Sequence, residues 1–237
     1  MQLVLNLTGQ SIRLPVAYRR ILQGLLYHGA ESEYSAFLHD SGYQAAKRRY
    51  KLFTFGPLSG SYELHGHEIV FRDTVRWEVR SVDARLIQLL LRAFQPGADL
   101  RLGENRVTVR DCVLEDRRIF EPQCTVRTLA PITVYLTTPE GRTEPFSPED
   151  PRFAQAVAVN ACRKWQSWTG DSTPPAFSFR VRQDTPYRKE VTTYQGTYIT
   201  GWSGLFTLEG PPAMLDLLYN TGLGAKNAQG FGMFEII

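Results

Sequence analysis

A glycine-rich segment near the C-terminus constrains the fold of this chain more than any other feature of its sequence. The segment, residues 222–232, has the sequence Gly-Leu-Gly-Ala-Lys-Asn-Ala-Gln-Gly-Phe-Gly. A short amphipathic helix opened by prolines is expected before it, from residue 211 to 219, and a strand after it, from residue 231 to 237. Glycine-rich turns that bind nucleotides run from a strand into a helix. This segment runs from a helix into a strand, which excludes the Rossmann and P-loop classes.

The glycines flank a short polar tip, and two interpretations of this arrangement are open. Glycine allows positive φ and lets a partner approach the backbone without a Cβ in the way, so exposed amides and one lysine could contact a phosphate backbone. The alternative is a glycine-rich connection that has no ligand. The candidate contact residues are Gly222, Gly224, Lys226, Asn227, Gln229, Gly230 and Gly232.

Length and composition favour a folded, mildly basic intracellular protein. A chain of 237 residues with 43% hydrophobic residues can form one large domain or two modest ones with real cores. Its formal net charge of +3 is compatible with an RNA or DNA partner. Three scattered cysteines indicate reduced thiols and no zinc knuckle. The sequence has neither a signal peptide nor a membrane-length apolar run, so we expect a soluble, cytoplasmic protein without a membrane partner.

The order of expected elements repeats once along the chain. In the first half, the patterns predict a strand, two helices, four strand segments, a helix and a strand, over residues 2–7, 15–30, 33–40, 52–55, 61–64, 68–71, 76–79, 82–94 and 106–114. In the second half, they predict a strand, a helix that Ser147 caps, two strands, a helix and a strand, over residues 125–137, 148–168, 177–181, 191–208, 211–219 and 231–237.

Both halves fit the βαββαβ order of ferredoxin-like folds. We therefore expect an α+β protein built from tandem ferredoxin-like (RRM-like) domains, residues 1–121 and 122–237. A single larger α+β domain is the alternative, because only the element order, and no repeat at the level of residues, supports the division.

Several motifs toward the two ends of the chain resemble those of one protein family. They are Leu14-Pro15-Val16, Leu22-Gln23-Gly24-Leu25-Leu26-Tyr27, Phe37-Leu38-His39-Asp40, Lys51-Leu52-Phe53-Thr54-Phe55 and the glycine-rich segment. In these motifs the chain resembles the CRISPR-associated repeat-processing endoribonucleases, the "Cas six" family of the RAMP superfamily. Between about residues 59 and 216 the similarity is one of element order alone.

The resemblance implies an endoribonuclease that cleaves CRISPR precursor RNA within its repeats, with repeat RNA as its partner. The ribose 2′-OH would attack the scissile phosphate and leave a 2′,3′-cyclic phosphate and a 5′-OH. This chemistry needs neither a metal nor a cofactor. It needs a base, an acid for the leaving oxygen and a cation for the phosphorane. Other CRISPR effector subunits are further candidate partners, and both a monomer and a homodimer are compatible with the resemblance.

Members of the family use a Tyr, a His and a Lys at places that match Tyr27, His39 and Lys51, which are therefore the candidate catalytic residues. At about 100° per residue, Tyr27 lies opposite the apolar stripe of its helix and should be exposed. His39 also falls away from the apolar face of its short helix. His28 flanks the apolar stripe of the first helix and is a poorer candidate.

A run of basic residues ends at Lys51. Such a run is usually a solvated face, and at best it contacts phosphates without regard to sequence. We expect its other basic members to contact RNA, namely Lys47, Arg48 and Arg49.

Two further functions are open. A non-catalytic RAMP subunit that binds guide RNA in an effector complex would share the fold and the glycine-rich segment, and the His-Tyr-Lys set is what distinguishes the nuclease from it. A generic RRM-like binder would need an RNP1-type strand with paired aromatics, to which Gly230-Phe231-Gly232-Met233-Phe234 corresponds only in part.

Overall fold

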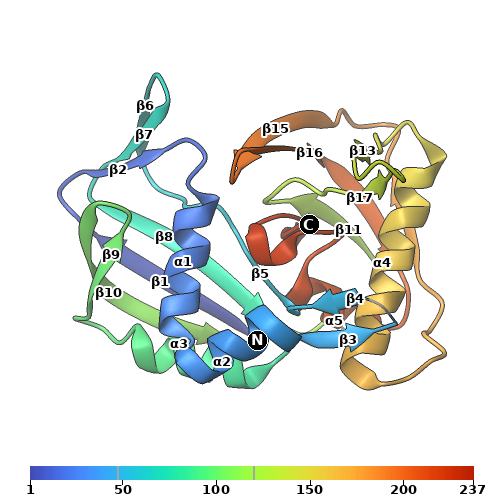
Figure 1. The fold of residues 1–237 in the computed structure, drawn as a ribbon, viewed down its shortest axis with the longest axis horizontal. Coiled ribbons are helices and arrows are strands. Elements are labelled where there is room, and N and C mark those ends of the chain that lie inside the picture. Colours follow the sequence, from blue (N-terminus) through green and yellow to red (C-terminus); the bar gives the residue numbers. More distant parts are fainter. Residues whose placement is uncertain (47, 120) are drawn as a thin grey trace.

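The computed structural model describes residues 1–46, 48–119 and 121–237, and its two largest sheets lie in the two halves of the chain (Figure 1). The first sheet is antiparallel, with the strand order β5-β8-β1-β10-β9. Helices α1 and α3 pack against each other and against this sheet. The elements are β1 (Gln2–Thr8), α1 (Arg19–Gly29), β5 (Phe53–Phe55), β8 (Thr74–Ser81), α3 (Ala84–Ala93), β9 (Asp99–Leu102) and β10 (Asn105–Glu115).

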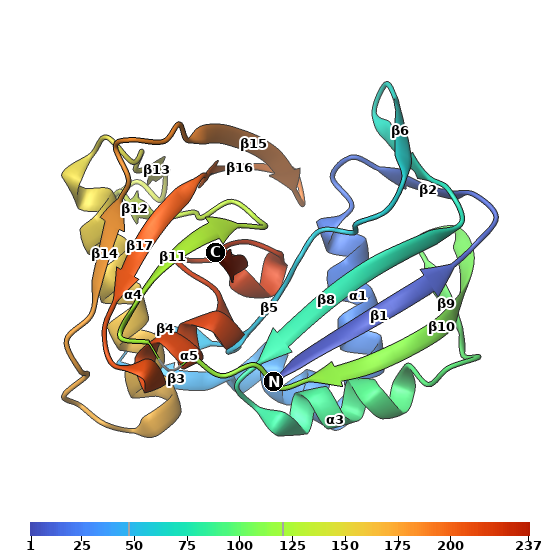
Figure 2. The same cartoon turned by 180° about the vertical axis from the view of Figure 1, so that it is seen from behind.

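The second sheet is also antiparallel, and its strand order is β14-β17-β11-β18. Helices α4 and α5 contact each other and share a buried core with this sheet. Figure 2 shows the two sheets side by side from the opposite direction. The elements are β11 (Gln123–Thr128), α4 (Pro151–Thr169), β14 (Ser178–Val181), β17 (Leu205–Glu209), α5 (Pro212–Thr221) and β18 (Phe234–Ile236).

Apart from the edge strand β9, the two sheets share one topology. In each, the third core strand along the chain lies between the second and the first, and the fourth lies on the other side of the first. This arrangement confirms the prediction of an α+β protein with tandem ferredoxin-like folds. Residue 120 lies outside the described residues, and the division into residues 1–121 and 122–237 stays a prediction.

Hairpins and short strands are inserted between these core elements. The segment expected to be one strand over residues 191–208 is instead a hairpin followed by β17, and the strand expected over residues 125–137 stops at Thr128. The inserted strands are β2 (Ile12–Pro15), β3 (Tyr43–Ala45), β4 (Arg48–Tyr50), β6 (Tyr62–His65), β7 (Glu68–Phe71), β12 (Tyr135–Thr137), β13 (Thr143–Pro145), β15 (Arg188–Tyr194) and β16 (Thr197–Ser203).

Two helix starts differ from the predictions. The first helix begins at Arg19, because Pro15 ends strand β2 and pairs opposite Glu68 of β7. The cap of α4 is Asp150 and not Ser147: its side chain accepts a hydrogen bond from the backbone N–H of Arg152 at 2.9 Å. No helix in the described ranges is both long enough and apolar enough to cross a membrane.

Each half buries its own hydrophobic core. In the first half, alternate residues of β1 face α1 and α3, and Trp77 of β8 is fully buried. In the second half, Phe179 and Phe206 pack with their ring centroids 5.0 Å apart beneath Phe153 of α4. The repeated element order predicts two such cores, because each sheet has an apolar face that the helices of its own half must cover.

A buried arginine joins the two halves. Arg80 of β8 donates from Nη1 to the backbone oxygen of Phe234 at 2.6 Å and from Nη2 to Glu78 Oε2 at 3.0 Å. Its guanidinium carbon lies 3.9 Å from the ring centroid of Tyr219. The guanidinium thus contacts an acid of its own strand and a carbonyl and an aromatic face of the other half, while its Nε has no hydrogen-bond partner among the described residues.

Replacing this arginine should weaken the junction between the halves. In Arg80→Met, Glu78 loses its buried partner and the carbonyl of Phe234 loses its donor, so we expect the free energy of unfolding to fall by about 3 kcal/mol or more. Arg76→Met is the matched control, because Arg76 bonds the same Glu78 from a side chain that is 42% exposed; it should cost less than about 1 kcal/mol. Urea unfolding measures both, and equal losses would contradict the assignment.

Candidate active site and nucleic-acid interface

Tyr27 and Lys51 form a hydrogen-bonded pair. Tyr27 projects from α1, and Lys51 lies between β4 and β5. Lys51 Nζ donates to Tyr27 Oη at 2.5 Å and lies 5.0 Å from the centroid of the tyrosine ring. The first half of the chain therefore brings together two of the three candidate catalytic residues.

Burial shifts the pKa of each side chain in the direction that favours its neutral form. Desolvation, with a smaller contribution from Tyr194, raises the pKa of Tyr27 to about 12, and desolvation lowers the pKa of Lys51. Because Lys51 donates to the phenol oxygen, the O–H of Tyr27 can donate to a ligand. The expectation of an exposed Tyr27 is wrong: the ring is half-buried and packs edge-on against Phe53, with centroids 6.4 Å apart.

His39 lies on an exposed helical turn. Helix α2 (Ser32–Ala36) continues into a π-helix, η1 (Phe37–Ser41), which Gly42 ends at a φ of 56°. The imidazole is 78% exposed, as predicted, and its Nδ1 lies 2.7 Å from Asp40 Oδ1. The carboxylate favours the proton on Nδ1, which leaves Nε2 to exchange a proton with a ligand. Within the described residues, no hydrogen bond joins His39 to Tyr27 or Lys51.

The basic run connects the histidine turn to a cavity. Arg49 Nη1 donates to the backbone oxygen of Asp40 at 2.5 Å, and both Arg48 and Arg49 line the cavity. Lys47, the remaining basic residue predicted to contact RNA, lies outside the described residues.

All four glycines of the C-terminal loop have positive φ, between 67° and 82°, and all four are buried. A Cβ would lie 1.9 Å from the oxygen of Leu223 at Gly232, 2.7 Å from the oxygen of Thr133 at Gly224 and 2.6 Å from the ring of Phe55 at Gly230. The glycines are therefore needed because the loop packs tightly against its own protein. The structure does not support the interpretation that their missing side chains admit an external backbone.

A buried lysine of α4 holds this loop in place. Lys164 Nζ donates to the backbone oxygen of Gly222 at 2.6 Å, to Asn227 Oδ1 at 2.6 Å and to the backbone oxygen of Thr221 at 3.3 Å. Three acceptors match the three N–H bonds of an ammonium group, while burial lowers the pKa of Lys164 to about 7. The sequence interpretation missed Lys164. Its signal was a lysine on the buried stripe of α4, together with Phe153, Val157 and Ala161.

Asn227 has an internal role in the same network. Its Oδ1 accepts from Lys164, and its Nδ2 donates to the backbone oxygens of Leu223 and Phe231 at 2.9 and 3.0 Å. Both ends of the amide are thus engaged within the protein. The geometry assigns the side chain of Asn227 to holding the loop, and a contact between this residue and RNA stays a prediction.

Helix α1 of the first half holds the other side of the loop. Arg19 Nε donates to the oxygen of Gly230 at 3.1 Å, and Gln23 Nε2 donates to the oxygen of Ala228 at 2.5 Å. Tyr194 of β15 donates to the amide oxygen of Gln23. The loop is therefore fixed between the two halves.

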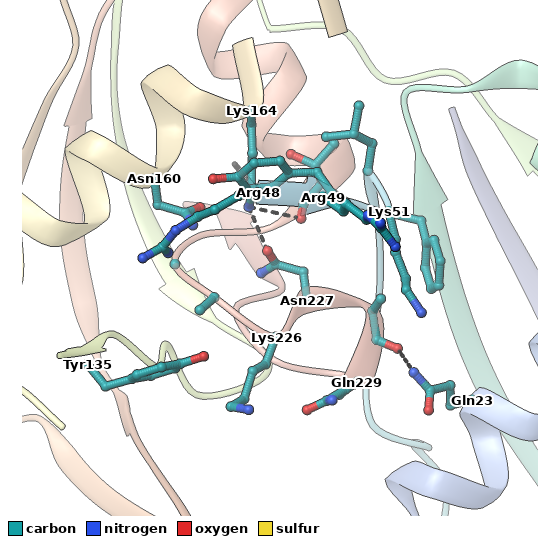
Figure 3. A pocket seen from close by; sticks show the side chains of 17 residues that line it. Gln23, Arg48, Arg49, Lys51, Tyr135, Asn160, Lys164, Lys226, Asn227 and Gln229 are labelled. Atoms are coloured by element: carbon teal, nitrogen blue, oxygen red, sulfur yellow. Dashed lines mark hydrogen bonds between the residues drawn. The ribbon is translucent and has the colours of Figure 1, made fainter. Parts of the chain in front are cut away.

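A cavity of about 330 Å³ lies between the loop, α1, α4 and the β4–β5 segment (Figure 3). Lys226 and Gln229 line it, and Lys226 Nζ lies 5.3 Å from the ring centroid of Tyr135. Five cationic side chains and no acidic ones occur among the described residues of its lining, which suits an anionic ligand. The lining residues are Gln23, Arg48, Arg49, Tyr50, Lys51, Leu52, Phe53, Tyr135, Asn160, Lys164, Thr221, Gly224, Ala225, Lys226, Asn227, Ala228 and Gln229.

The described residues hold no group of three His, Cys, Asp or Glu side chains that could bind a metal ion. The chemistry that the cavity wall offers is that of phenol, amine, guanidinium and carboxamide groups.

The packing of the loop predicts how it responds to a methyl group. Gly232→Ala combines a positive φ with a clash against a backbone oxygen, so it should lower the free energy of unfolding by about 2–4 kcal/mol. Gly66→Ala is the matched control, since Gly66 has a φ of 61° but nothing within 4 Å of the added Cβ, and should cost only about 1 kcal/mol. Chemical denaturation measures the difference, and a Gly232→Ala loss no larger than the control would refute the packing argument.

Comparison with known proteins agrees with this architecture. The chain is 23% identical over 234 residues to the CRISPR-associated endoribonuclease Cas6 of Pyrococcus furiosus, covering 96% of this chain and 85% of the relative. A solved structure of a Cas6-related protein from the same organism has a TM-score of 0.84 at 19% identity and covers 100% of this chain and 98% of its own. A solved RAMP protein that binds different RNA substrates has a TM-score of 0.83 at 19% identity, covering 100% and 99%. At these identities the two structures show the shared fold.

The decisive comparison is with a family model described as CRISPR associated protein Cas6, C-terminal, which matches residues 114–236. This range contains the whole second sheet, Lys164 and the glycine-rich loop, and is more than half of the chain. The chain therefore belongs to the Cas6 family.

Proposed function

We propose that this protein is an endoribonuclease that cleaves CRISPR precursor RNA within its repeats. The observation that carries the proposal is the Tyr27–Lys51 hydrogen bond of 2.5 Å beside a cationic cavity that both halves of the chain form. Family membership and the endoribonuclease named among its relatives support it. Repeat RNA is the substrate, bound along the arginines of β4 and at the cavity.

The proposed reaction transfers the scissile phosphate from the 5′-oxygen to the neighbouring 2′-oxygen. His39 Nε2 accepts the proton of the 2′-OH, whose oxygen attacks phosphorus, and the P–O5′ bond breaks. Tyr27 protonates the leaving 5′-oxygen, and Lys51 stabilises both the phosphorane and the phenolate that forms. The products are a 2′,3′-cyclic phosphate and a 5′-OH, and the charge requirements are met without a metal ion.

The proposed in-line reaction does not require His39 to touch the Tyr27–Lys51 pair. The attacking and leaving oxygens lie on opposite sides of phosphorus, so the base and the acid need not touch each other. Arg49 contacts the backbone of Asp40 and also lines the cavity, which gives one path for RNA past both groups. Asp40 orients the imidazole for its part.

A non-catalytic RAMP subunit that binds guide RNA is the second candidate. The exposure of His39, which no described hydrogen bond joins to Tyr27 or Lys51, favours this candidate. It predicts binding of repeat RNA without any cut.

The attack by the 2′-OH can be tested on the substrate itself. Repeat RNA from the genome that encodes the protein should be cut once in EDTA, and replacing the single ribose upstream of the cut with deoxyribose should abolish cleavage while binding stays nearly intact. Denaturing gels and a filter-binding assay measure the two effects. Cleavage of the deoxy substrate, or a strict Mg²⁺ requirement, would overturn the mechanism, and binding without any cut would favour the non-catalytic subunit.

His39 can be tested against a second exposed histidine. His39→Ala should slow single-turnover cleavage by about 10²–10⁴, the usual worth of general acid–base catalysis, with little change in affinity. His28→Ala, on the exposed side of α1, is the control and should remain near wild type, as should the equivalent changes at His65 and His67. If His28→Ala is the severe variant, the assignment is wrong. If neither histidine matters, Tyr27→Phe and Lys51→Met test a reaction that those two side chains carry alone.

A further inference from the structure

The histidine turn, η1, has a backbone conformation that needs support from other parts of the chain. The N–H of Gly42 donates to the backbone oxygen of Phe37 at 2.7 Å, and this bond spans five residues, as in a π-helix. Such turns are rare and occur frequently at functional sites. Since η1 carries His39, the contacts that hold this turn also fix where the imidazole lies.

One carboxylate bonds to both flanks of the turn. Tyr34, in α2 before the turn, and Tyr43, in β3 after it, both donate a hydrogen bond to Oδ2 of Asp83. The ring centroid of Phe37 lies 5.6 Å from that of Tyr34 and 5.4 Å from that of Tyr43. Desolvation, together with the bond to Asp83, raises the pKa of both tyrosines, so their O–H groups remain donors. Asp83 therefore holds the turn at its two ends.

Asp83 itself is fixed at the corner between β8 and α3. Its Oδ1 accepts from the backbone N–H of Arg85 at 2.8 Å, which makes it the N-cap of α3. Its backbone N–H donates to Ser81 Oγ at 3.0 Å. The buried hydroxyl of Ser81 in turn donates to the backbone oxygen of Leu52 at 3.0 Å. The corner is thus bonded to the flanks of the histidine turn and to the residue that follows Lys51.

The backbone at Leu52 depends on contacts of this kind. Its φ is 50°, in the left-handed region, where a residue other than glycine is strained. Such strain persists only where the surrounding structure fixes the backbone. Because Lys51 immediately precedes Leu52, a change in this backbone would move Lys51 relative to Tyr27.

We propose that the β8–α3 corner sets the position of the histidine turn relative to Lys51, with Ser81 and Asp83 as positioning residues of the reaction. The inference rests on the proposed function, because the base and the cation of that reaction lie on the two segments that the corner joins. No hydrogen bond among the described residues links His39 to Lys51, so the protein between them has to fix their separation. Hydrogen bonds from both segments meet at this corner.

The first test separates the tyrosine bonds from the helix cap. Asp83→Ser keeps a good N-cap residue but removes the oxygen that both tyrosines bond. Displacing the imidazole by about 1 Å should slow single-turnover cleavage of repeat RNA by about 10–100-fold, with little change in affinity by filter binding. Asp150→Ser, the same exchange at the N-cap of α4, is the matched control and should cut at the wild-type rate. Equal rates for the two variants would overturn the proposal.

A second set of variants shows whether the effect passes through the histidine. In a His39→Ala background, Asp83→Ser should slow cleavage no further, because a displaced turn cannot matter once the imidazole is gone. A further loss as large as in the wild-type background would mean a general effect on the fold and would refute the positioning role. Tyr34→Phe combined with Tyr43→Phe removes the same two bonds, should give the same slow rate, and replaces Asp83→Ser as the test if that variant does not fold.

Ser81→Ala tests the other side of the corner. It leaves the carbonyl of Leu52 without this donor, so it should slow cleavage about tenfold in the wild-type protein and have no further effect in Lys51→Met. An equal loss in both backgrounds would overturn the role of Ser81.

The positioning role and the nuclease can fail separately. Hydrogen exchange followed by mass spectrometry requires no cleavage, and peptides covering residues 35–43 should exchange about tenfold faster in Asp83→Ser and not in Asp150→Ser, since two hydrogen bonds to a charged group are lost. Unchanged exchange overturns the positioning role even in a protein that cuts RNA. Faster exchange in a protein that binds repeat RNA without cutting it supports the hold of Asp83 on the turn and overturns the nuclease.

Discussion

The buried ammonium of Lys164 is the interaction on which the site depends. It satisfies acceptors at Thr221, Gly222 and Asn227 at the start and the tip of the glycine-rich loop. Asn227 in turn donates hydrogen bonds to Leu223 and Phe231, which lie on the two sides of the tip. A loop with four left-handed glycines has many conformations in the unfolded chain, and this network selects one of them. That conformation presents two carbonyls to α1 and sets Lys226 and Gln229 at the cavity.

The site is divided between the halves by type of chemistry. The first half holds the three residues to which we assign the proton transfers of the proposed reaction, Tyr27, His39 and Lys51. The second half supplies a rigid loop and the amides and aromatic ring around the cavity. Because burial raises the pKa of Tyr27 and lowers that of Lys51, the pair resists carrying opposite full charges. A phosphate beside it would supply the charge that favours the ammonium form of Lys51.

Much of the fold was predictable from sequence, because the repeated order of strands and helices depends on local periodicity. Several of the failures depended on contacts between distant segments. Tyr27 is half-buried because Phe53 of another element covers it, which no helical periodicity can show. Strands β3 and β4 have only three residues each and little apolar pattern. The glycine-rich loop was located correctly, but its glycines are required by packing within the protein. The lysine that anchors the loop, Lys164, is more than fifty residues away in the sequence. The candidate catalytic residues were identified by resemblance to a family, and their roles stay predictions.

The β3–β4 hairpin belongs to the first half by sequence and yet packs on α4 of the second, where Tyr43 meets Trp168 with ring centroids 5.6 Å apart. The two halves are therefore not structurally independent units. Opening the cavity between the halves by a hinge motion would have to break these contacts between the hairpin and α4. The same contacts make it difficult to exchange halves between relatives. If the first half were fused to the second half of a relative, its β3–β4 hairpin would lack the α4 surface on which it packs here.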